Sequence, residues 1–189
     1  MKPEEVLASI EKVAPRRGLP IIGAKRGQFL DEVTEQHRPT TILEVGTLVG
    51  YSAIRMGRHL QGDGRMTCVE LSYDRARTAR ANIELAGLSG RIEVIVGDAR
   101  SVLPELKGRF DMVFLDAVKE DYLIYLKSIE GLLHPGSVVV ADNAKSHAEA
   151  VAPYLEYVRN SGKYSSTYRE APPSFGSGPG DAIEVSVRL

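Results

Sequence analysis

The stretch Ile42-Leu-Glu-Val-Gly-Thr-Leu-Val-Gly-Tyr-Ser52 decides the fold of this chain of 189 residues. It begins as an apolar run of strand length and ends where a helical pattern opens. Between the two stand Glu44, Gly46 and Gly50, in an E-x-G-x-x-x-G pattern. Glycines at such a turn let the backbone approach a ligand where a side chain would collide, and the helix N-terminus favours a negative ligand group. The stretch therefore predicts a strand, a ligand-binding turn and a helix.

On either side of this stretch, apolar runs of strand length alternate with longer helical patterns. We expect strands at Thr41–Val45, Arg65–Leu71, Ile92–Val96, Phe110–Leu115, Ser137–Ala141, Tyr164–Glu170 and Asp181–Leu189. Alternating strands and helices give parallel strands with right-handed crossovers, and hence helices on both faces of the sheet. The last two strands flank the Gly/Pro/Ser-rich loop Pro172–Gly180 and should pair antiparallel. The expected fold is α/β: a Rossmann-like, seven-stranded, mostly parallel sheet whose last strand is antiparallel.

The helical patterns complete this architecture. We expect helices at Lys2–Ala14, Ile22–His37, Tyr51–Leu60, Tyr73–Ala86, Ser101–Leu106, Asp121–Leu133 (ending at His134-Pro135-Gly136) and Ser146–Asn160. The length suits one domain with a real core and is too short for two ordinary ones. We therefore expect residues 1–189 to form a single domain, in which the N-terminal helices of residues 1–38 help to cover the ligand site.

Composition removes several classes of protein. With 43% hydrophobic and 26% charged residues, the chain is typical of a soluble globular protein. Its formal net charge of -1 gives no basic excess for nucleic acid, which is an unsupported partner rather than an excluded one. No signal-peptide pattern and no run of 18 apolar residues is present, so we expect a cytoplasmic protein without a membrane partner. The single Cys68 forms no internal disulfide and reads as a buried thiol.

The glycine spacing separates two classes of cofactor. A dinucleotide site requires G-x-G-x-x-G, whose glycines make room for a pyrophosphate, and Gly46 and Gly50 do not match that spacing. Glu44 would repel a phosphate but can hold the charged amine of a methionine moiety. Glu70, at the end of the second expected strand, is placed to bind a ribose diol. The pattern favours S-adenosylmethionine over NAD, and a plain strand-to-helix turn is the simpler alternative.

Two acidic segments, Phe114-Leu-Asp116 and Ala141-Asp-Asn143, end the fourth and fifth expected strands. Asp116, Asp142 and Asn143 offer three hard oxygen ligands, with the amine of Lys119 three residues after the first. Magnesium prefers six oxygens, so three from protein leave places for two adjacent substrate oxygens and one water. Lys119 can then take the proton from the hydroxyl that is methylated.

Each of these residues also has a simpler interpretation. Asp116 is alternatively a helix cap or a cofactor-side acid, and Asp142-Asn143 an ordinary strand-end turn. Lys119 alone would be a solvated surface lysine. Asp98 could simply cap the helix near Ser101, and Tyr51 and Ser52 could simply begin a helix. The histidines show no metal-ligand spacing and are expected to be surface residues or local contacts: His37, His59, His134 and His147.

From Thr41 to Asn143 the chain resembles the catechol O-methyltransferase family, including its small bacterial relatives. The resemblance lies in the glycine motif, in Val69-Glu70, in Val96-Gly-Asp-Ala99 and in the two acidic segments, and extends weakly to Arg26-Gly-Gln28 and Gly180-Asp-Ala-Ile-Glu184. It implies a fold that binds S-adenosylmethionine and a divalent cation such as Mg²⁺. The implied cofactor contacts are Glu44, Gly46, Gly50, Tyr51, Ser52, Glu70, Leu71, Gly97, Asp98, Ala99 and Asp116. The implied metal ligands are Asp116, Asp142 and Asn143, and the implied catalytic base is Lys119.

The expected reaction is Mg²⁺-dependent transfer of a methyl group to a hydroxyl of a small catechol-like phenolic acceptor. Departures from the mammalian pattern leave the acceptor open, because the chain has no Trp, carries Ala117 and Val118 after the metal-binding Asp116, and has no acid in Pro172–Gly180. Two alternatives are a tRNA-modifying enzyme of the same family that acts on a hydroxylated base and a degenerate cofactor-binding module. A homodimer is compatible with the sequence, which does not fix the oligomeric state.

Overall fold

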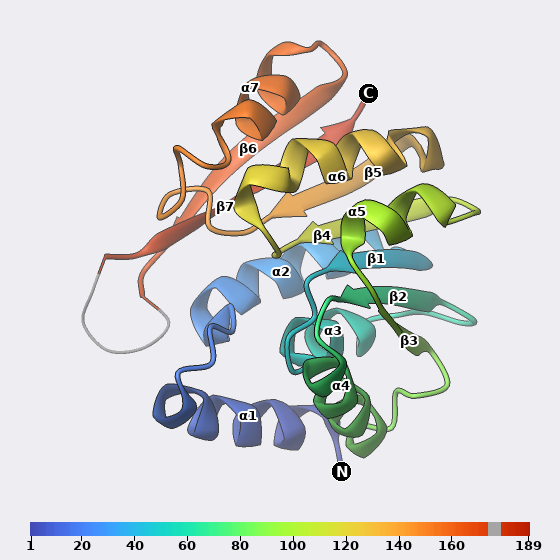
Figure 1. The fold of residues 1–189 in the computed structure, drawn as a ribbon, viewed down its shortest axis with the longest axis vertical. Coiled ribbons are helices and arrows are strands. Elements are labelled where there is room, and N and C mark those ends of the chain that lie inside the picture. The colour runs from blue at the N-terminus through green and yellow to red at the C-terminus, as the bar shows by residue number, and fades with distance from the viewer. Residues whose placement is uncertain (174–178) are drawn as a thin grey trace.

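The structure is a computed structural model that describes residues 1–173 and 179–189 (Figure 1). Within these residues, seven strands form one sheet in the order β3-β2-β1-β4-β5-β7-β6. They are β1 (Thr41–Val45), β2 (Arg65–Glu70), β3 (Ile92–Val96), β4 (Phe110–Leu115), β5 (Leu133–Ala141), β6 (Tyr164–Ala171) and β7 (Asp181–Arg188). Strand β7 runs antiparallel to both of its neighbours, and the other pairs are parallel. The expected fold class is confirmed.

Helices cover both faces of the sheet, as expected (Figure 1). One face carries α1 (Pro3–Arg17), α2 (Gly23–His37), α3 (Tyr51–Gly57) and α4 (Tyr73–Leu85). The other carries α5 (Ala99–Val102), α6 (Tyr122–Ile129) and α7 (Ala152–Asn160), with short 3₁₀ turns η1 (Leu103–Glu105), η2 (Lys119–Asp121) and η3 (Glu130–Leu132). No helix in the described residues is long and apolar enough to cross a membrane.

The central strands are buried on both faces because their side chains alternate between two apolar clusters. In β4, Met112 and Phe114 pack toward α1–α4, whereas Val113 and Leu115 pack toward α5–α7. Double-sided burial explains why the parallel strands read as near-continuous apolar runs. Cys68 lies in the first cluster as a buried free thiol, as expected.

The expected helix Asp121–Leu133 is wrong at its C-terminal end. Helix α6 stops at Ile129, and β5 begins at Leu133, so the His134-Pro135-Gly136 segment belongs to the strand. The pairing of β4 with β5 shifts register in this segment. The Ser137 hydroxyl bridges the irregularity by donating to the Phe110 carbonyl at 2.8 Å and accepting from the His134 amide at 2.9 Å. A side chain therefore supplies hydrogen bonds that a regular ladder would have made.

Helix α7 also differs, since it begins at Ala152 rather than Ser146. Asp181 accepts hydrogen bonds from the amide and the hydroxyl of Ser146, which holds this segment in turns. Pro153 then lies in the first turn of the helix, where its missing N–H costs nothing. Helix α1 continues through Pro15 to Arg17, beyond the expected end at Ala14.

The chain between β6 and β7 contains residues 174–178, so that part of the expected Pro172–Gly180 loop lies outside the described residues. The two strands pair antiparallel from Tyr164 opposite Arg188 to Ala171 opposite Asp181. The expected hairpin is confirmed, and its β7 strand brings Asp181 back to the carboxyl edge of the sheet.

Candidate active site

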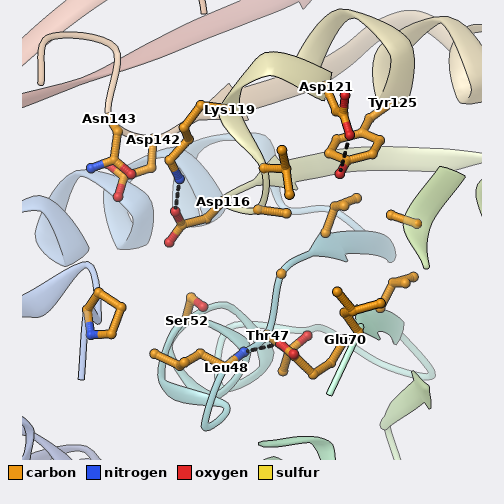
Figure 2. Close-up of a pocket in the computed structure, with 18 of the residues that line it drawn as sticks. Thr47, Leu48, Ser52, Glu70, Asp116, Lys119, Asp121, Tyr125, Asp142 and Asn143 are labelled. Carbon is orange, nitrogen blue, oxygen red and sulfur yellow. Dashed lines mark hydrogen bonds and ion pairs between the residues drawn. The ribbon is translucent and has the colours of Figure 1, made fainter. Parts of the chain in front are cut away.

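A cavity of about 620 Å³ opens at the carboxyl edge of the sheet. Its walls come from the ends of β1, β2, β4 and β5, the segment between α1 and α2, and the start of α5. The strand order reverses between β1 and β4, and ligands of open α/β sheets gather at such a reversal. Figure 2 shows Ser52 and Glu70 on one side of the pocket and Lys119 and Asn143 on the other.

The glycine turn after β1 depends on its first glycine. Gly46 has φ of +93°, and a Cβ atom there would lie 2.3 Å from the carbonyl oxygen of Asp116. A side chain at this position would therefore both strain the backbone and collide with the chain that follows β4. Gly50 also has a positive φ, of +85°, just before α3. The turn is thus tight enough to place β1 and β4 side by side at the cavity floor.

Glu70, the expected ribose-binding acid, ends β2 at the cavity wall. One carboxylate oxygen accepts the Leu48 amide at 2.8 Å, and the other accepts the Ser72 amide at 2.9 Å. These bonds fix the side chain and tie it to the glycine turn. Each carboxylate oxygen has a second lone pair, so the group can still accept hydrogen bonds from a ligand diol.

Glu44 lies deeper than the sequence suggests. Its side chain is fully buried and does not line the cavity, because Ser52 stands in front of it and donates to one carboxylate oxygen. The other oxygen has no hydrogen-bond partner among the described residues. Burial raises the pKa of Glu44 to about 7, against the lowering effect of Ser52. A buried carboxylate in this state is poised to gain from a nearby positive charge.

The other expected cofactor residues, apart from Gly50, line the cavity. Asp98 caps α5 by accepting a hydrogen bond from the Arg100 amide at 2.9 Å. It therefore both lines the cavity and caps the helix. Leu71 and Val118 line the cavity with side chains that are exposed by 69% and 50%, respectively. Such large exposed apolar side chains beside a cavity provide surfaces for a planar apolar group. At the same end, Asp121 accepts a hydrogen bond from Tyr125 (Figure 2).

The expected metal and base residues converge at the far end of the cavity (Figure 2). The Lys119 ammonium lies 2.7 Å from Asp116 Oδ1. Asp142 is buried after β5, and its Oδ1 lies 2.6 Å from the Arg26 guanidinium, which comes from α2. Each acid of the pair is therefore contacted by a cation of the chain itself, Asp116 by Lys119 and Asp142 by Arg26.

The two carboxylates raise the cost of each other's charge. Burial raises the pKa of Asp116, and burial together with the Asp116 charge raises the pKa of Asp142. Two like charges in one buried site are stabilised most by a shared cation. The described residues contain no group of three or more His, Cys, Asp or Glu side chains suited to a metal. The candidate donor set is instead two carboxylates and the Asn143 amide, which fits a hard cation that keeps several water or substrate ligands.

Asn143 is oriented by Asp181. Its backbone has φ of +60°, and its side-chain amide donates to Asp181 Oδ2 at 2.7 Å. Because the amide nitrogen is engaged there, the amide oxygen is left to face other partners. Asp181 also contacts Arg26 at 3.1 Å. Hydrogen bonds from Ser146 and Asn143 lower the pKa of Asp181 to about 2, although burial acts to raise it.

Sequence reasoning gave three residues at this end of the cavity too little weight. Arg26 has only weak support as an active-site residue, yet it lines the cavity. His147 is exposed and contacts Ser146, which confirms the expected surface or local contact, but it also lines the cavity. Asp181 is given no role, although it supports the cavity from behind. The available signal was weak: Arg26-Gly-Gln28 and Gly180-Asp181 are the two places where the resemblance extends beyond the core segments.

Comparison with known proteins adds independent findings. The family model described as O-methyltransferase matches residues 3–161. A pig protein named catechol O-methyltransferase is 38% identical over 154 residues, which are 78% of this chain and 82% of that protein. A protein of the same name from Niastella koreensis is 37% identical over 146 residues, which are 74% of this chain and 66% of that protein.

Solved structures agree with the sequence comparison. The O-methyltransferase from Bacillus cereus in complex with SAH superposes with a TM-score of 0.87 at 28% identity, covering 98% of this chain and 91% of that one. The O-methyltransferase TomG from Streptomyces achromogenes, in complex with SAM, gives a TM-score of 0.85 at 28% identity, with coverage of 97% and 89%.

Proposed function

This chain belongs to the O-methyltransferase family, and we propose that it methylates one hydroxyl of a small ortho-dihydroxy aromatic, using S-adenosylmethionine and Mg²⁺. One observation carries the proposal: two buried carboxylates and an amide converge beside Lys119 at one end of a cavity whose other end is the glycine turn. The methyl donor and the acceptor oxygen can therefore occupy one continuous space.

We assign the cofactor to the β1–β2–β3 side of the cavity. Glu70 would accept the ribose hydroxyls with its remaining lone pairs, since both of its oxygens are already held in place by backbone amides. The ammonium of the methionine moiety would lie near Ser52, where the unpartnered oxygen of Glu44 provides negative charge. Leu71 and Val118 would cover the faces of the adenine. The SAH- and SAM-bound structural neighbours support this cofactor.

We assign the cation to Asp116, Asp142 and Asn143. Mg²⁺ held by these three residues would supply positive charge that favours the ionised form of a nearby acceptor hydroxyl. Asp181 fixes the Asn143 side chain, and Arg26 holds Asp142 and Asp181 together. The donor set suits the cation because both carboxylates are buried and have raised pKa values without a divalent charge.

Lys119 is the proposed base. Its amine sits at the cavity wall, three residues after Asp116, and in its neutral form can accept the proton of the hydroxyl that is methylated. The acceptor oxygen would then bond to the methyl carbon as the bond between that carbon and the sulfonium sulfur breaks. S-adenosylhomocysteine would leave with the electron pair on sulfur, and the hydroxyl proton would remain on Lys119. The protein would contribute mainly orientation, because donor and acceptor would bind at opposite ends of one cavity.

A tRNA acceptor has little support from composition. A formal net charge of -1 gives no basic excess for an RNA backbone. The relatives named for catechol methylation support a small phenolic acceptor instead.

Acceptor geometry tests the proposal. With saturating S-adenosylmethionine and Mg²⁺, we expect catechol to be methylated and its 1,3-dihydroxy isomer, resorcinol, and phenol to react at least about 100-fold more slowly, since they cannot chelate through adjacent oxygens. Product is quantified by transfer of an isotopically labelled methyl group. Equal rates for catechol and phenol would contradict a chelated ortho pair.

A further inference from the structure

A chain of hydrogen bonds leads from Asp181 to the cavity wall at its metal end. The Ser146 hydroxyl donates to Asp181 Oδ2 at 2.6 Å, and its oxygen lies 2.9 Å from His147 Nδ1. The His147 amide donates to the Asn143 carbonyl at 3.1 Å, which keeps the imidazole within one turn of the metal ligand. The segment is thus fixed at both its side chains and its backbone.

This chain of bonds determines the tautomer of His147. A serine hydroxyl carries one proton, and Ser146 gives that proton to the Asp181 carboxylate, which can only accept. The Ser146 oxygen must therefore act as acceptor toward His147, so Nδ1 carries the imidazole proton. In the neutral ring, Nε2 is then left as a hydrogen-bond acceptor on a residue that lines the cavity.

An ortho-dihydroxy acceptor needs such a group. One hydroxyl gives its proton to Lys119, while the other keeps its proton and requires an acceptor of its own. Among the described side chains at this end, Asp116 and Asp142 belong to the proposed metal set, and Asp181 does not line the cavity. His147 is the side chain there that has a free acceptor lone pair outside the metal set.

We propose that His147 Nε2 accepts a hydrogen bond from the acceptor hydroxyl that is not methylated, an inference that rests on the proposed function. His147 is then an acceptor-binding residue, and the Asp181–Ser146 pair positions it by fixing its tautomer. The contact distinguishes the two hydroxyls of the acceptor: one lies toward Lys119 and the other toward His147. It also favours free ortho-dihydroxy compounds over their monomethyl ethers, which have lost one of the two donors.

Steady-state kinetics with catechol tests the contact. We expect His147→Leu to raise KM for catechol about 3- to 10-fold while kcat changes less than about twofold, because a neutral hydrogen bond is lost. His147→Gln keeps an acceptor oxygen and should recover part of the affinity. His37→Leu, at the end of α2, is the matched control and should leave KM unchanged. Binding of SAH by calorimetry should be the same in all variants.

Imidazole ¹⁵N NMR tests the tautomer without turnover, and the chain has only four histidines to assign. We expect the neutral ring of His147 to carry its proton on Nδ1 in the wild type and to lose that preference in Ser146→Ala. Catechol added with SAH and Mg²⁺ should shift the Nε2 resonance of His147.

The outcomes separate the two proposals. A wild type that methylates catechol, together with an unchanged KM in His147→Leu or a His147 proton on Nε2, would overturn the role of His147 and leave the proposed function intact. A wild type that binds SAH but neither binds nor methylates catechol would overturn both.

Discussion

At the scale of single residues, the proposed reaction depends on the contact between Lys119 and Asp116. The two lie three residues apart, where β4 ends and η2 begins, and their charged atoms are 2.7 Å apart. Lys119 also lies 5.3 Å from the centre of the Tyr122 ring, which further limits the directions its amine can take. A lysine held in this way at a cavity wall is positioned to exchange a proton with a ligand.

Replacing this lysine should separate chemistry from binding. We expect Lys119→Ala to lower kcat for catechol about 10²- to 10⁴-fold, the usual contribution of a general base. Affinity for SAH should stay within about threefold of the wild type, because the side chains assigned to the ribose and the methionine ammonium, Glu70 and Ser52, belong to β2 and α3. Rapid-quench measurement of methyl transfer gives the rate of the chemical step, and calorimetry gives the affinity for SAH. Full turnover in the variant would remove Lys119 from the mechanism.

Residue by residue, the sequence predicts contacts that are near in the chain better than those that are far. Asp116 and Lys119 are three residues apart, and both acidic segments end adjacent parallel strands, so their convergence follows from the fold. The contacts of Arg26 with Asp142 and Asp181 join residues 116 and 155 positions apart. No local pattern contains that information. The sequence also does not predict that Glu44 is buried away from the cavity, because this depends on the position of the Ser52 side chain between them.

At the scale of elements, the glycine turn is the segment least able to change. We expect Gly46→Ala to lower the free energy of unfolding by about 1–3 kcal/mol more than Gly136→Ala. Both glycines have nearly the same φ, +93° and +91°, but a Cβ on Gly136 meets nothing within 4 Å. The pair therefore shares the backbone strain and differs in the collision with Asp116. Chemical denaturation of the two variants measures the difference, and equal losses would show that the close approach is unimportant.

The turn before α7 should make the stability of the protein depend on pH. The folded-state pKa of Asp181, about 2, lies below its ordinary value of 3.8, so its stabilising contribution is present above about pH 5 and is lost as pH falls toward 2. We expect Asp181→Asn to lower the free energy of unfolding by about 1–2 kcal/mol at pH 7 and by about half as much at pH 3.

The exposed Asp74 provides the control for this prediction. Asp74→Asn should change stability by less than about 0.5 kcal/mol at either pH. Urea unfolding at pH 7 and pH 3 measures both variants against the wild type. A constant difference between Asp181→Asn and the wild type at the two pH values would contradict the role of the Asp181 charge.

Elements were predictable where backbone periodicity decides them. Strands β1, β3 and β4 begin and end at the expected residues, because each is an apolar run between turn residues. The first residues of β5 and α7 could not be predicted in this way, because hydrogen bonds of single side chains override the local sequence pattern there. Ser137 supplies the hydrogen bonds of the irregular β4–β5 pairing, and Asp181 holds Ser146 in a turn from 35 residues away.

At the scale of the whole molecule, the strand order creates one cavity with two ends. The reversal between β1 and β4 separates the glycine turn from the acidic segments, while β7 returns Asp181 to the same edge. The segment from Pro20 to Ile22 and Arg26 of α2 also line the cavity. This placement supports the proposal that residues 1–38 cover the cofactor and acceptor within a single domain.

Occupancy of the cofactor end should stabilise the entire fold. At a free SAH concentration of 100 times Kd, linkage adds about 2.7 kcal/mol to the free energy of unfolding. For a chain of this size, we expect Tm to rise by about 5–11 °C. Differential scanning calorimetry measures the shift, and Glu70→Gln should reduce it at the same SAH concentration. A wild-type Tm that does not respond to SAH would contradict the assigned cofactor end.

The most direct test of the central claim is the dependence of catechol methylation on a divalent cation. With saturating S-adenosylmethionine and catechol, we expect an excess of EDTA to abolish product, Mg²⁺ in excess of EDTA to restore it, and Asp142→Asn to respond weakly to Mg²⁺. SAH affinity measured in parallel should be unaffected by EDTA. Undiminished methylation of catechol by the wild type in EDTA would contradict the metal site formed by Asp116, Asp142 and Asn143.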